Sequence, residues 1–209
     1  MIPADEATLP LAVEYLRAGE PLVFPTDTVY GLGALYTDEA AVRKIYQIKG
    51  RPQDKPIPLL LADTQGVIEV AKEVPELAWR LMDQFFPGPL TLVLARSDDV
   101  PEWVTAGSKG VAVRVPDHHF TRSLIRRAGA PLATSSANLA GRAASVTAQE
   151  AYDQIGLRVA LILDGGDCHE GVASTVLDLT GPSPVLLREG AIRRPRLEEV
   201  CGRIIDMLE

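Results

Sequence analysis

The segment PTDTVYGLGAL, residues 25–35, carries the strongest pattern in this chain of 209 residues. It follows the apolar run Leu-Val-Phe at 22–24, which predicts a short buried strand that ends at Pro25. A polar loop with two threonines and one aspartate comes next, and then an apolar segment that contains Gly31 and Gly33. Glycines at this spacing allow a backbone to approach a ligand closely or to adopt dihedral angles that other residues avoid. The pattern favours either a tight strand-loop-strand corner or a ligand-binding loop, and both interpretations stay open here.

A second polar segment, KGRPQDKP at residues 49–56, places three cations within seven residues, although the chain has a formal net charge of −7. An arginine guanidinium binds phosphate oxygens through two parallel hydrogen bonds, and a lysine ammonium supplies point charge. The chain has neither a Gly-x-x-x-x-Gly-Lys-(Ser/Thr) loop nor a Gly-x-Gly-x-x-Gly segment that opens a helix. A bound nucleotide would therefore need counter-charge from such side chains. The alternative interpretation is a solvated basic turn.

The two segments together resemble the YrdC/TsaC family, the threonylcarbamoyl-adenylate synthases of tRNA modification. The family's characteristic runs are Pro-Thr-(Glu/Asp)-Thr-Val-Tyr-Gly-Leu-Gly and Lys-x-Arg-Pro, and both are nearly unaltered here. The resemblance is to the short form, without an extra C-terminal domain, and covers about residues 24–192. Three further matches follow in order: VRVP at 113–116, TSSAN at 134–138, and STV at 174–176 with LREGAI at 187–192.

The composition is typical of one globular domain that spans residues 1–209. Hydrophobic residues make up 46% of the chain, enough for a core, and no apolar run is long enough to span a membrane. Residues 1–6 lack the basic and apolar regions of a signal peptide, so we expect a cytoplasmic protein with no membrane partner. Cys168 and Cys201 are too few for a disulfide scaffold. The net charge of −7 predicts weak or no direct tRNA binding, because nucleic-acid affinity comes largely from neutralised phosphates.

Helical and strand patterns alternate along the chain, which favours an α/β architecture. Together with the resemblance, this predicts a single-domain twisted mixed β-sheet flanked by helices, the YrdC-like fold, with a concave ligand cleft. Thr37 is the predicted cap of a helix that Gly50 ends, and Thr147 forms a predicted capping box with Glu150. The other expected helices are 75–86, 120–128 and a closing amphipathic helix at 195–209, and the expected strands are 57–62, 90–94, 111–115, 159–163, 175–179 and 185–188.

Arg114 lies in the predicted strand 111–115, VAVRV. Side chains alternate between the two faces of a strand, so the three valines share one face and Arg114 projects from the other. An arginine in this position needs a partner or water, because burying it unpaired is costly. The pattern leaves open whether it faces solvent, an internal carboxylate or the carboxylate of a ligand. The resemblance implies that Arg114 contacts the carboxylate of L-threonine.

The resemblance implies two groups of binding residues. No nucleophile is implied, and charge stabilisation is assigned to Arg51 and Lys55. Hydroxyl and amide groups at the end of a strand, as at 134–138, also satisfy turns, so that interpretation stays open. The implied L-threonine site contains Thr28, Leu60, Arg114, Thr134 and Ser174. The implied ATP site contains Lys49, Arg51, Lys55, Ser136, Asn138 and Arg188.

Four positions depart from the family pattern. Leu60 stands where several members have histidine near the threonine pocket, and Ala140 replaces a frequent serine. Residues 143–144, two alanines, replace proline and serine. No charged group is lost, so we expect these changes to affect affinity more than activity.

The implied reaction condenses L-threonine, bicarbonate and ATP into threonylcarbamoyl-AMP and pyrophosphate, for the threonylcarbamoyladenosine modification of tRNA. ATP is a substrate, its phosphates carry Mg²⁺, and we expect no tightly bound cofactor. The adjacent pairs His118-His119 and Cys168-His169 have poor chelate geometry, which disfavours a metal site and favours a surface loop. In bacteria the implied partners are TsaB, TsaD and TsaE.

Three other functions are compatible with a fold of this kind. One is a double-stranded RNA-binding or ribosome-assembly protein, which the acidic balance disfavours. Another is a YciO-type paralogue with a different substrate, which departs from the Lys-Gly-Arg-Pro and Ser-Ala-Asn segments that this chain keeps. The third is the carbamoyl-adenylate module of hydrogenase maturation, which normally comes with zinc-finger cysteines and an acylphosphatase domain that this sequence does not contain.

Overall fold

The loop at residues 25–30 joins two antiparallel strands inside a large sheet. The computed structural model describes residues 1–206 and pairs β2 (Leu22–Phe24) with β3 (Gly31–Leu35), with Val23 opposite Leu32. Every residue from 21 to 34 is buried, the loop included. The predicted strand-loop-strand corner is therefore confirmed, and its polar side chains must find partners within the protein.

Within residues 1–206 the sheet has eleven strands, in the order β1-β8-β2-β3-β7-β4-β6-β5-β9-β10-β11. Parallel and antiparallel neighbours both occur, which confirms the predicted mixed sheet. The remaining strands are β1 (Ile2–Pro3), β4 (Leu59–Leu60), β5 (Leu90–Ala95), β6 (Gly110–Arg114), β7 (Leu132–Ser136), β8 (Leu161–Asp164), β9 (Thr175–Asp178), β10 (Val185–Arg188) and β11 (Ile205–Asp206).

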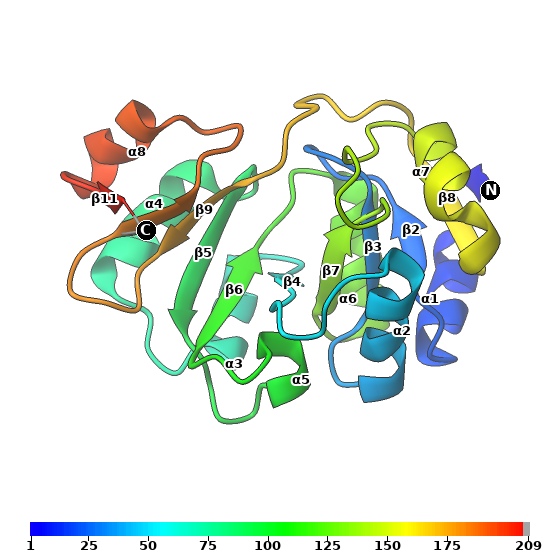
Figure 1. Ribbon diagram of the computed structural model, residues 1–209, viewed down its shortest axis with the longest axis horizontal. Helices are drawn as coiled ribbons and strands as arrows, with labels where there is room; N and C mark the ends of the chain where they lie inside the picture. The colour runs from blue at the N-terminus through cyan, green and yellow to red at the C-terminus, as the bar shows by residue number, and fades with distance from the viewer. Residues whose placement is uncertain (207–209) are drawn as a thin grey trace.

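Helices flank the sheet and bury two separate apolar clusters against it. Within residues 1–206, one cluster joins α1 and α6 to residues of β2, β4, β7 and β8. The larger one joins α2, α4, α7 and α8 to the sheet, and it includes the alternate residues Val23, Ala133 and Ile162 of β2, β7 and β8. Figure 1 shows α4 and α8 beside β5 and β9 at one end of the molecule, and α1, α2 and α7 at the other. The helices are α1 (Leu9–Arg17), α2 (Glu39–Lys49), α3 (Val67–Val70), α4 (Glu76–Phe85), α5 (Glu102–Thr105), α6 (His119–Ala128), α7 (Ala148–Ile155) and α8 (Arg194–Cys201), with 3-10 turns at Thr64–Gly66 and Gly156–Arg158.

The short strand β4 lies between β6 and β7 near the middle of the sheet. Leu60 is opposite Arg114 of β6 on one side and Leu132 of β7 on the other. The predicted strand 57–62 is thus reduced to two residues, because Pro58 has no N–H to donate to a ladder. The register places Leu60, Arg114 and Leu132 on one face of the sheet, since directly paired residues point the same way.

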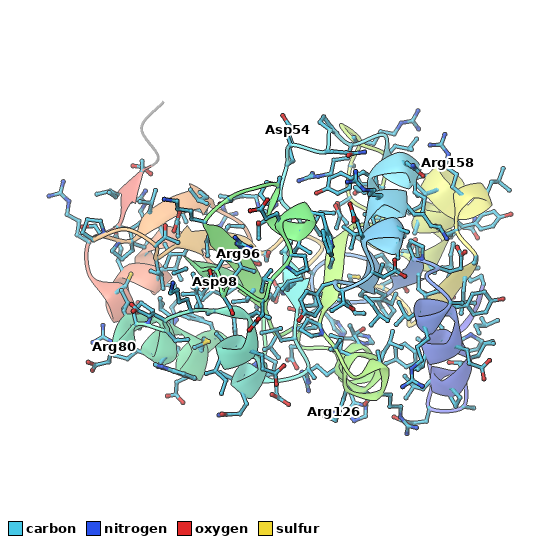
Figure 2. The ribbon with its side chains drawn as sticks, turned by 90° about the horizontal axis from the view of Figure 1, so that it is seen from below. Asp54, Arg80, Arg96, Asp98, Arg126 and Arg158 are labelled. Carbon is cyan, nitrogen blue, oxygen red and sulfur yellow. The ribbon has the colours of Figure 1, made fainter. Side chains whose placement is uncertain are left out.

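The start of α2 differs from the prediction. The capping residue is Asp38, whose carboxylate accepts a hydrogen bond from the backbone N–H of Ala41 at 3.0 Å, and not Thr37. The helix ends as predicted at Gly50, which has a φ of 61°, a left-handed conformation that glycine adopts without strain. The end of α2 sets the direction of the 50–56 segment, which Figure 2 shows projecting beside α2 with Asp54 at its tip.

The predicted closing helix 195–209 is wrong in its second half. Helix α8 ends at Cys201, and Gly202 follows with a φ of 72°. The chain then forms β11, in which Ile205 pairs in parallel with Val185 of β10. The apolar spacing of Leu197 and Ile204 reflects burial of both side chains, the first from a helix and the second just before a strand. Leu208, which the prediction also included, lies outside the described residues.

Other predicted elements agree with the structure. Gly129 ends α6 with a φ of 84°, and the Thr147 hydroxyl accepts from the N–H of Glu150 at 3.1 Å to start α7. The surface-loop prediction for the two His and Cys pairs is only partly correct: His118 precedes α6 with an extended backbone, but His119 is the first residue of that helix. Cys168 and His169 do lie in a loop, although Cys168 is buried. None of the helices within residues 1–206 is long and apolar enough to cross a membrane.

Candidate functional site

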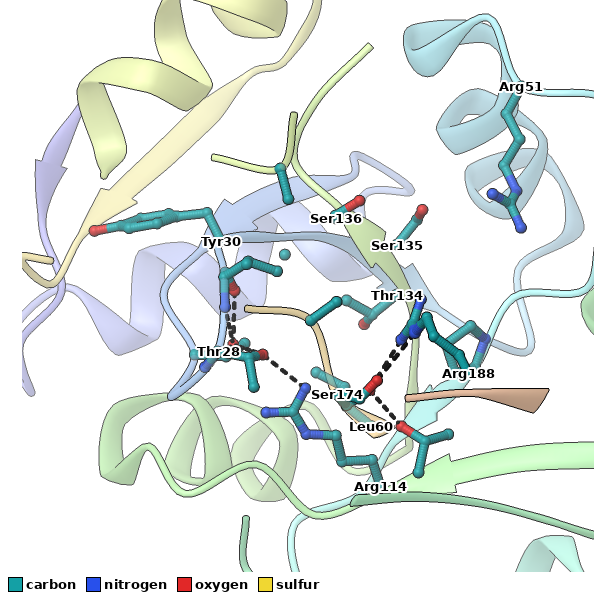
Figure 3. A pocket seen from close by; sticks show the side chains of 17 residues that line it. Thr28, Tyr30, Arg51, Leu60, Arg114, Thr134, Ser135, Ser136, Ser174 and Arg188 are labelled. Carbon is teal, nitrogen blue, oxygen red and sulfur yellow. Dashed lines mark hydrogen bonds between the residues drawn. The ribbon is translucent and has the colours of Figure 1, made fainter. Parts of the chain in front are cut away.

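A pocket of about 190 Å³ lies where the loop 25–30 meets β4, β6, β7 and the segment before β9. The segment before β9 belongs to the connection that crosses from one half of the sheet to the other (Figure 1). The wall combines three arginines with threonine and serine hydroxyls, as Figure 3 shows. The lining residues include Thr26, Thr28, Arg51, Leu60, Thr91, Arg114, Thr134, Ser135, Ser136, Ser174 and Arg188.

Thr26 shapes the loop from within. Its hydroxyl donates to the carbonyl oxygen of Val29 at 2.6 Å and accepts from the backbone N–H groups of Thr28 and Val29, each at 3.2 Å. The Thr28 hydroxyl lies 3.1 Å from that of Thr26 and accepts from Arg114. One buried hydroxyl therefore fixes the turn that presents Thr28 to the pocket, a typical use of threonine in a tight loop.

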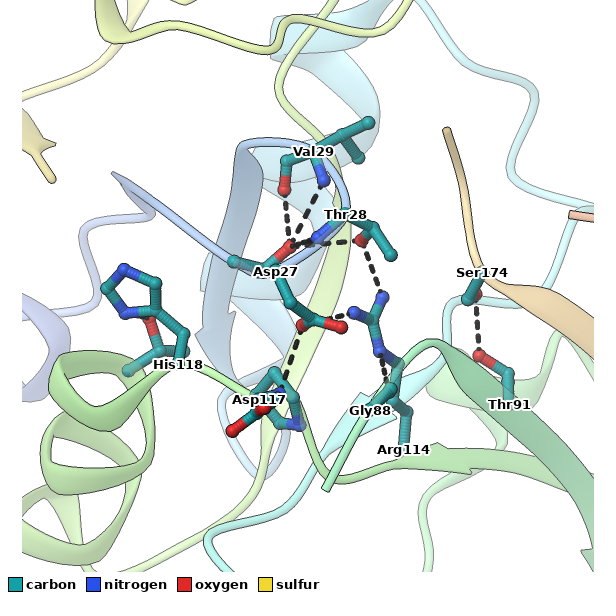
Figure 4. Close-up of polar contacts among 12 residues, drawn as sticks. Asp27, Thr28, Val29, Gly88, Thr91, Arg114, Asp117, His118 and Ser174 are labelled. Carbon is teal, nitrogen blue, oxygen red and sulfur yellow. Dashed lines mark hydrogen bonds and ion pairs between the residues drawn. The ribbon is translucent and has the colours of Figure 1, made fainter. Parts of the chain in front are cut away.

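Arg114 forms a buried ion pair with Asp27, and the two residues are 6% and 7% exposed. Its guanidinium donates to Asp27 Oδ1 at 2.5 Å, to Thr28 Oγ1 at 2.8 Å and to the carbonyl oxygen of Gly88 at 2.9 Å (Figure 4). Burial lowers the pKa of Arg114, and the charge of Asp27 opposes that shift. The sequence left three possible partners for Arg114: solvent, an internal carboxylate or a ligand carboxylate. The structure contains the internal carboxylate, and Arg114 also forms part of the pocket wall.

Gly31 and Gly33 make room for Thr134, a predicted site residue on the neighbouring strand. A Cβ atom at Gly33 would lie 2.7 Å from Thr134 Oγ1 and 2.9 Å from the ring of Phe24. A Cβ atom at Gly31 would lie 2.9 Å from Thr134 Cγ2. The two glycines are therefore needed for close packing of the Thr134 and Phe24 side chains against β3. A close approach of this backbone to a ligand stays a prediction.

Ser174 connects the pocket to β5 and β10. Its hydroxyl is 2.8 Å from that of Thr91 and accepts from Arg188 Nη2 at 3.2 Å, while Arg188 Nε donates to the Ser174 carbonyl oxygen at 3.0 Å. The sequence prediction missed Thr91. The available signal was its position in LTLVL, where a polar residue alternates with three leucines that are fully buried on the opposite face.

Arg51 and Arg188 supply positive charge that no carboxylate neutralises within residues 1–206. Arg51 Nη2 donates to the carbonyl oxygen of Pro56 at 3.2 Å, and its buried Nε has no partner in that range. Burial lowers the pKa of Arg188, and the nearby charges of Arg114 and Arg51 lower it further. Three guanidinium groups therefore act on one cavity, which favours an anionic ligand.

Lys49 does not line the pocket, and only 3% of it is exposed. Its ammonium donates to the carbonyl oxygens of Ser136 and Asn138, the second at 2.6 Å. Burial, followed by the charge of Arg51, lowers its pKa to about 8. Lys49 thus orients the segment that presents Ser136 to the pocket, and a direct contact of Lys49 with ATP stays a prediction.

Eight of the eleven predicted site residues line this one pocket; Lys49, Lys55 and Asn138 do not. Asn138 is buried and its amide donates to the carbonyl oxygens of Leu139 and Arg142, which holds the turn after β7. Lys55 is exposed on the 50–56 segment. Leu60, the departure from the family pattern, forms an apolar part of the wall with an exposed fraction of 4%.

The donor set suits phosphate and carboxylate better than a bare metal ion. In the part of the chain that the structure describes, no three His, Cys, Asp or Glu residues lie together in a way that could hold a metal. The Asp27 carboxylate, on the loop that lines part of the pocket, is paired with Arg114. A magnesium ion at this site would be held by the phosphate oxygens of a nucleotide, which is its common mode of binding.

A family model for Sua5, YciO and YrdC proteins, described as "Telomere recombination", matches residues 14–190. The threonylcarbamoyl-AMP synthase of Pyrococcus abyssi is 42% identical over 200 residues, 96% of this chain and 59% of the relative. The enzyme of the same name from Bacillus subtilis is 44% identical over 194 residues, 92% of this chain and 56% of the relative. This chain therefore spans less than two thirds of the length of either relative.

Solved structures agree with the fold over nearly the whole chain. The crystal structure of P. abyssi Sua5 complexed with L-threonine has a TM-score of 0.95 and 41% identity, and the match covers 97% of this chain and 60% of that one. The structure of Escherichia coli YciO has a TM-score of 0.82 and 29% identity, with 91% and 93% covered.

Proposed function

This chain belongs to the Sua5/YciO/YrdC family, and on that premise we propose that it is an L-threonylcarbamoyladenylate synthase. Its substrates would be L-threonine, bicarbonate and ATP, and its products threonylcarbamoyl-AMP and pyrophosphate. One observation carries the proposal. The arginines and hydroxyls that the family motifs supply converge on a single pocket, in a fold shared with a relative that binds L-threonine.

In the proposed reaction the amine of L-threonine and bicarbonate first form a carbamate with loss of water. A carbamate oxygen then attacks the α-phosphate of ATP, and the bond between the α-phosphate and the β-phosphate breaks to release pyrophosphate. The described wall of the pocket offers cations and hydroxyls but no side chain poised as a covalent nucleophile. The protein would act by placing the reactants together and by offsetting negative charge as it develops.

We assign the amino acid to the Arg114 end of the pocket. Arg114 would bind its carboxylate, with Thr28, Thr134 and Ser174 as hydroxyl contacts and Leu60 as an apolar wall. We assign the triphosphate to the other end, where Arg51 and Arg188 have no acidic partner within residues 1–206 and Ser136 lies at the strand end. Asn138 would complete the ATP site and Lys49 would support it from beneath. Lys55, exposed on the 50–56 segment, would add positive charge near the phosphates without a close contact.

The same proposal includes a cytoplasmic location and a place in tRNA modification. ATP would bring Mg²⁺ on its phosphates, and partners such as TsaB, TsaD and TsaE would transfer the threonylcarbamoyl group to adenosine in tRNA. Weak or no direct tRNA binding by this chain remains our expectation, because its net charge is −7. Tight RNA binding at physiological salt would favour the RNA-binding alternative instead.

The decisive experiment measures pyrophosphate release from ATP with each substrate left out in turn. We expect release only when L-threonine and bicarbonate are both present. ATP hydrolysis at the same rate without threonine would contradict the proposal. Replacement of threonine by other amino acids in this assay would separate a threonine enzyme from a paralogue with a different substrate.

A further inference from the structure

Asp27 lies in the loop 25–30 but not in the pocket wall, and it has no role in the sites assigned above. Its Oδ1 accepts from Arg114 Nη2 at 2.5 Å and from the backbone N–H of Asp117 at 3.0 Å. Its backbone carbonyl oxygen accepts from the N–H of Glu170 at 3.0 Å. The residue therefore ties together the loop, the start of α6 and the connection that leads to Ser174 (Figure 4).

The contacts of Arg114 leave two of the five N–H donors of its guanidinium without a partner within residues 1–206. A guanidinium has five N–H donors, and the protein uses one on Nε, one on Nη1 and one on Nη2, toward Gly88, Thr28 and Asp27. Two N–H groups remain, one on each terminal nitrogen, which is the number that a bidentate carboxylate needs. Of the three protein partners, only Asp27 carries a charge.

Asp27 itself is shielded from any ligand. Its Oδ2 is buried and has no hydrogen-bond partner within residues 1–206, and the whole residue is 7% exposed. A group with no accessible oxygen cannot contact a molecule in the pocket. Within residues 1–206, Arg114 is the residue of the pocket wall that the Asp27 carboxylate contacts, so a change in that carboxylate acts on the pocket through Arg114.

We propose that Asp27 is a positioning residue that holds the Arg114 guanidinium in place for the carboxylate of the amino-acid substrate. This inference rests on the proposed function, because it takes Arg114 as the carboxylate contact. Thr28 and Gly88 orient the guanidinium by neutral hydrogen bonds, and Asp27 adds a charge-assisted one from the side away from the ligand. Loss of the Asp27 charge would free the Arg114 side chain to turn away from the substrate.

The test compares L-threonine with L-threoninamide, which lacks the carboxylate, by calorimetry on Asp27→Asn. The wild-type protein should prefer threonine. In Asp27→Asn we expect this preference to fall about tenfold, because a misplaced guanidinium loses a bidentate charge-assisted contact. Loss of structure alone would lower the melting temperature of the variant without changing the ratio of the two affinities.

Asp117→Asn is the matched control. It removes a carboxylate from the adjacent segment, where Asp117 pairs with Arg122 at 3.0 Å, but keeps the backbone N–H that Asp27 accepts. Its preference for threonine should stay within about twofold of wild type, since an exposed ion pair contributes little. An equal loss of preference in Asp117→Asn and Asp27→Asn would mean that net charge, and not positioning, is responsible, and would overturn the proposal.

Asp27→Glu serves as the conservative variant. It keeps the charge but moves the carboxylate by one methylene, so we expect a preference between those of wild type and Asp27→Asn. If Asp27→Asn does not fold, the test rests on Asp27→Glu. A preference of Asp27→Glu for L-threonine over L-threoninamide equal to that of the wild-type protein would then overturn the proposal. A wild-type protein that does not prefer threonine would instead refute the proposed function. A wild-type preference retained in Asp27→Asn would refute only the role of Asp27.

Discussion

The two ends of the pocket hold their arginines in different ways. At the closed end, Arg114 is 6% exposed and donates to three protein groups, one of them the carboxylate of Asp27. At the open end, Arg51 and Arg188 have no carboxylate partner within residues 1–206. A buried arginine needs a counter-charge for the fold to be stable, whereas an accessible one can wait for the ligand to supply it. Substitutions at the closed end should therefore change both protein stability and ligand binding. Substitutions at the open end should mainly change ligand binding.

The largest effect that we expect is on stability at the closed end. Arg114→Ala leaves the buried Asp27 carboxylate without its partner, which should lower the free energy of unfolding by about 3–5 kcal/mol. Urea denaturation measures it. Arg188→Ala, at the open end, removes hydrogen bonds to Ser174 but leaves no buried charge unpaired, so it should cost no more than about 1.5 kcal/mol. Similar losses in the two variants would show that the ends do not differ as described.

At the open end we expect the effect on ATP binding instead. Arg51→Ala and Arg188→Ala should each weaken ATP by about 1.5–3 kcal/mol, the typical contribution of a hydrogen bond to a charged group. Calorimetry without threonine measures this directly. Arg114→Lys is the comparison from the closed end, and it should alter threonine affinity much more than ATP affinity. Unaltered ATP affinity in both open-end variants would make this region a solvated surface.

The sequence predicted which arginines belong to the site, but it did not predict that Arg114 has an internal carboxylate partner while Arg51 and Arg188 have none within residues 1–206. The motifs predicted Arg51, Arg114 and Arg188 as site residues, and all three line the pocket. The alternation of valines placed Arg114 on the face opposite those valines. The partner of Arg114 was not predictable, because Asp27 is 87 residues away and local spacing carries no information about such pairs. Burial of the loop follows from its place between central strands, a tertiary fact that composition does not reveal.

The segment 49–56 shows the same limit in a different way. Three cations that are close in sequence occupy three environments: Lys49 is buried under β7, Arg51 lines the pocket and Lys55 faces solvent. The reason is that α2 ends between the first and the second of them, at Gly50. Because all three residues are cations, the sequence predicted the same role for each of them. The end of α2 at Gly50 instead places them in different environments.

Lys49 gives a smaller effect, which appears in the pH dependence of stability. Its pKa is about 8 in the folded protein against an ordinary value of 10.5, so above pH 8 the unfolded chain binds more protons than the folded one. Stability from this group therefore rises with pH, by about 1.5 kcal/mol between pH 8 and 9.5. Lys49→Met should remove that rise in urea denaturation at both pH values. The same rise in Lys49→Met would assign it to another group.

The smallest effect should come from Lys55, which lies in the same basic segment as Arg51 but outside the Lys-x-Arg-Pro run. Its side chain is exposed and forms no ion pair in the described part of the chain, and only its backbone carbonyl oxygen has a role, accepting from the Tyr46 hydroxyl at 2.8 Å. An exposed lysine contributes little unless a ligand draws it in, so Lys55→Ala should weaken ATP by less than about 1 kcal/mol. Calorimetry beside Arg51→Ala provides the scale. A loss as large as that of Arg51→Ala would mean that the 50–56 segment moves onto bound ATP, and that the open end of the pocket is completed only by its ligand.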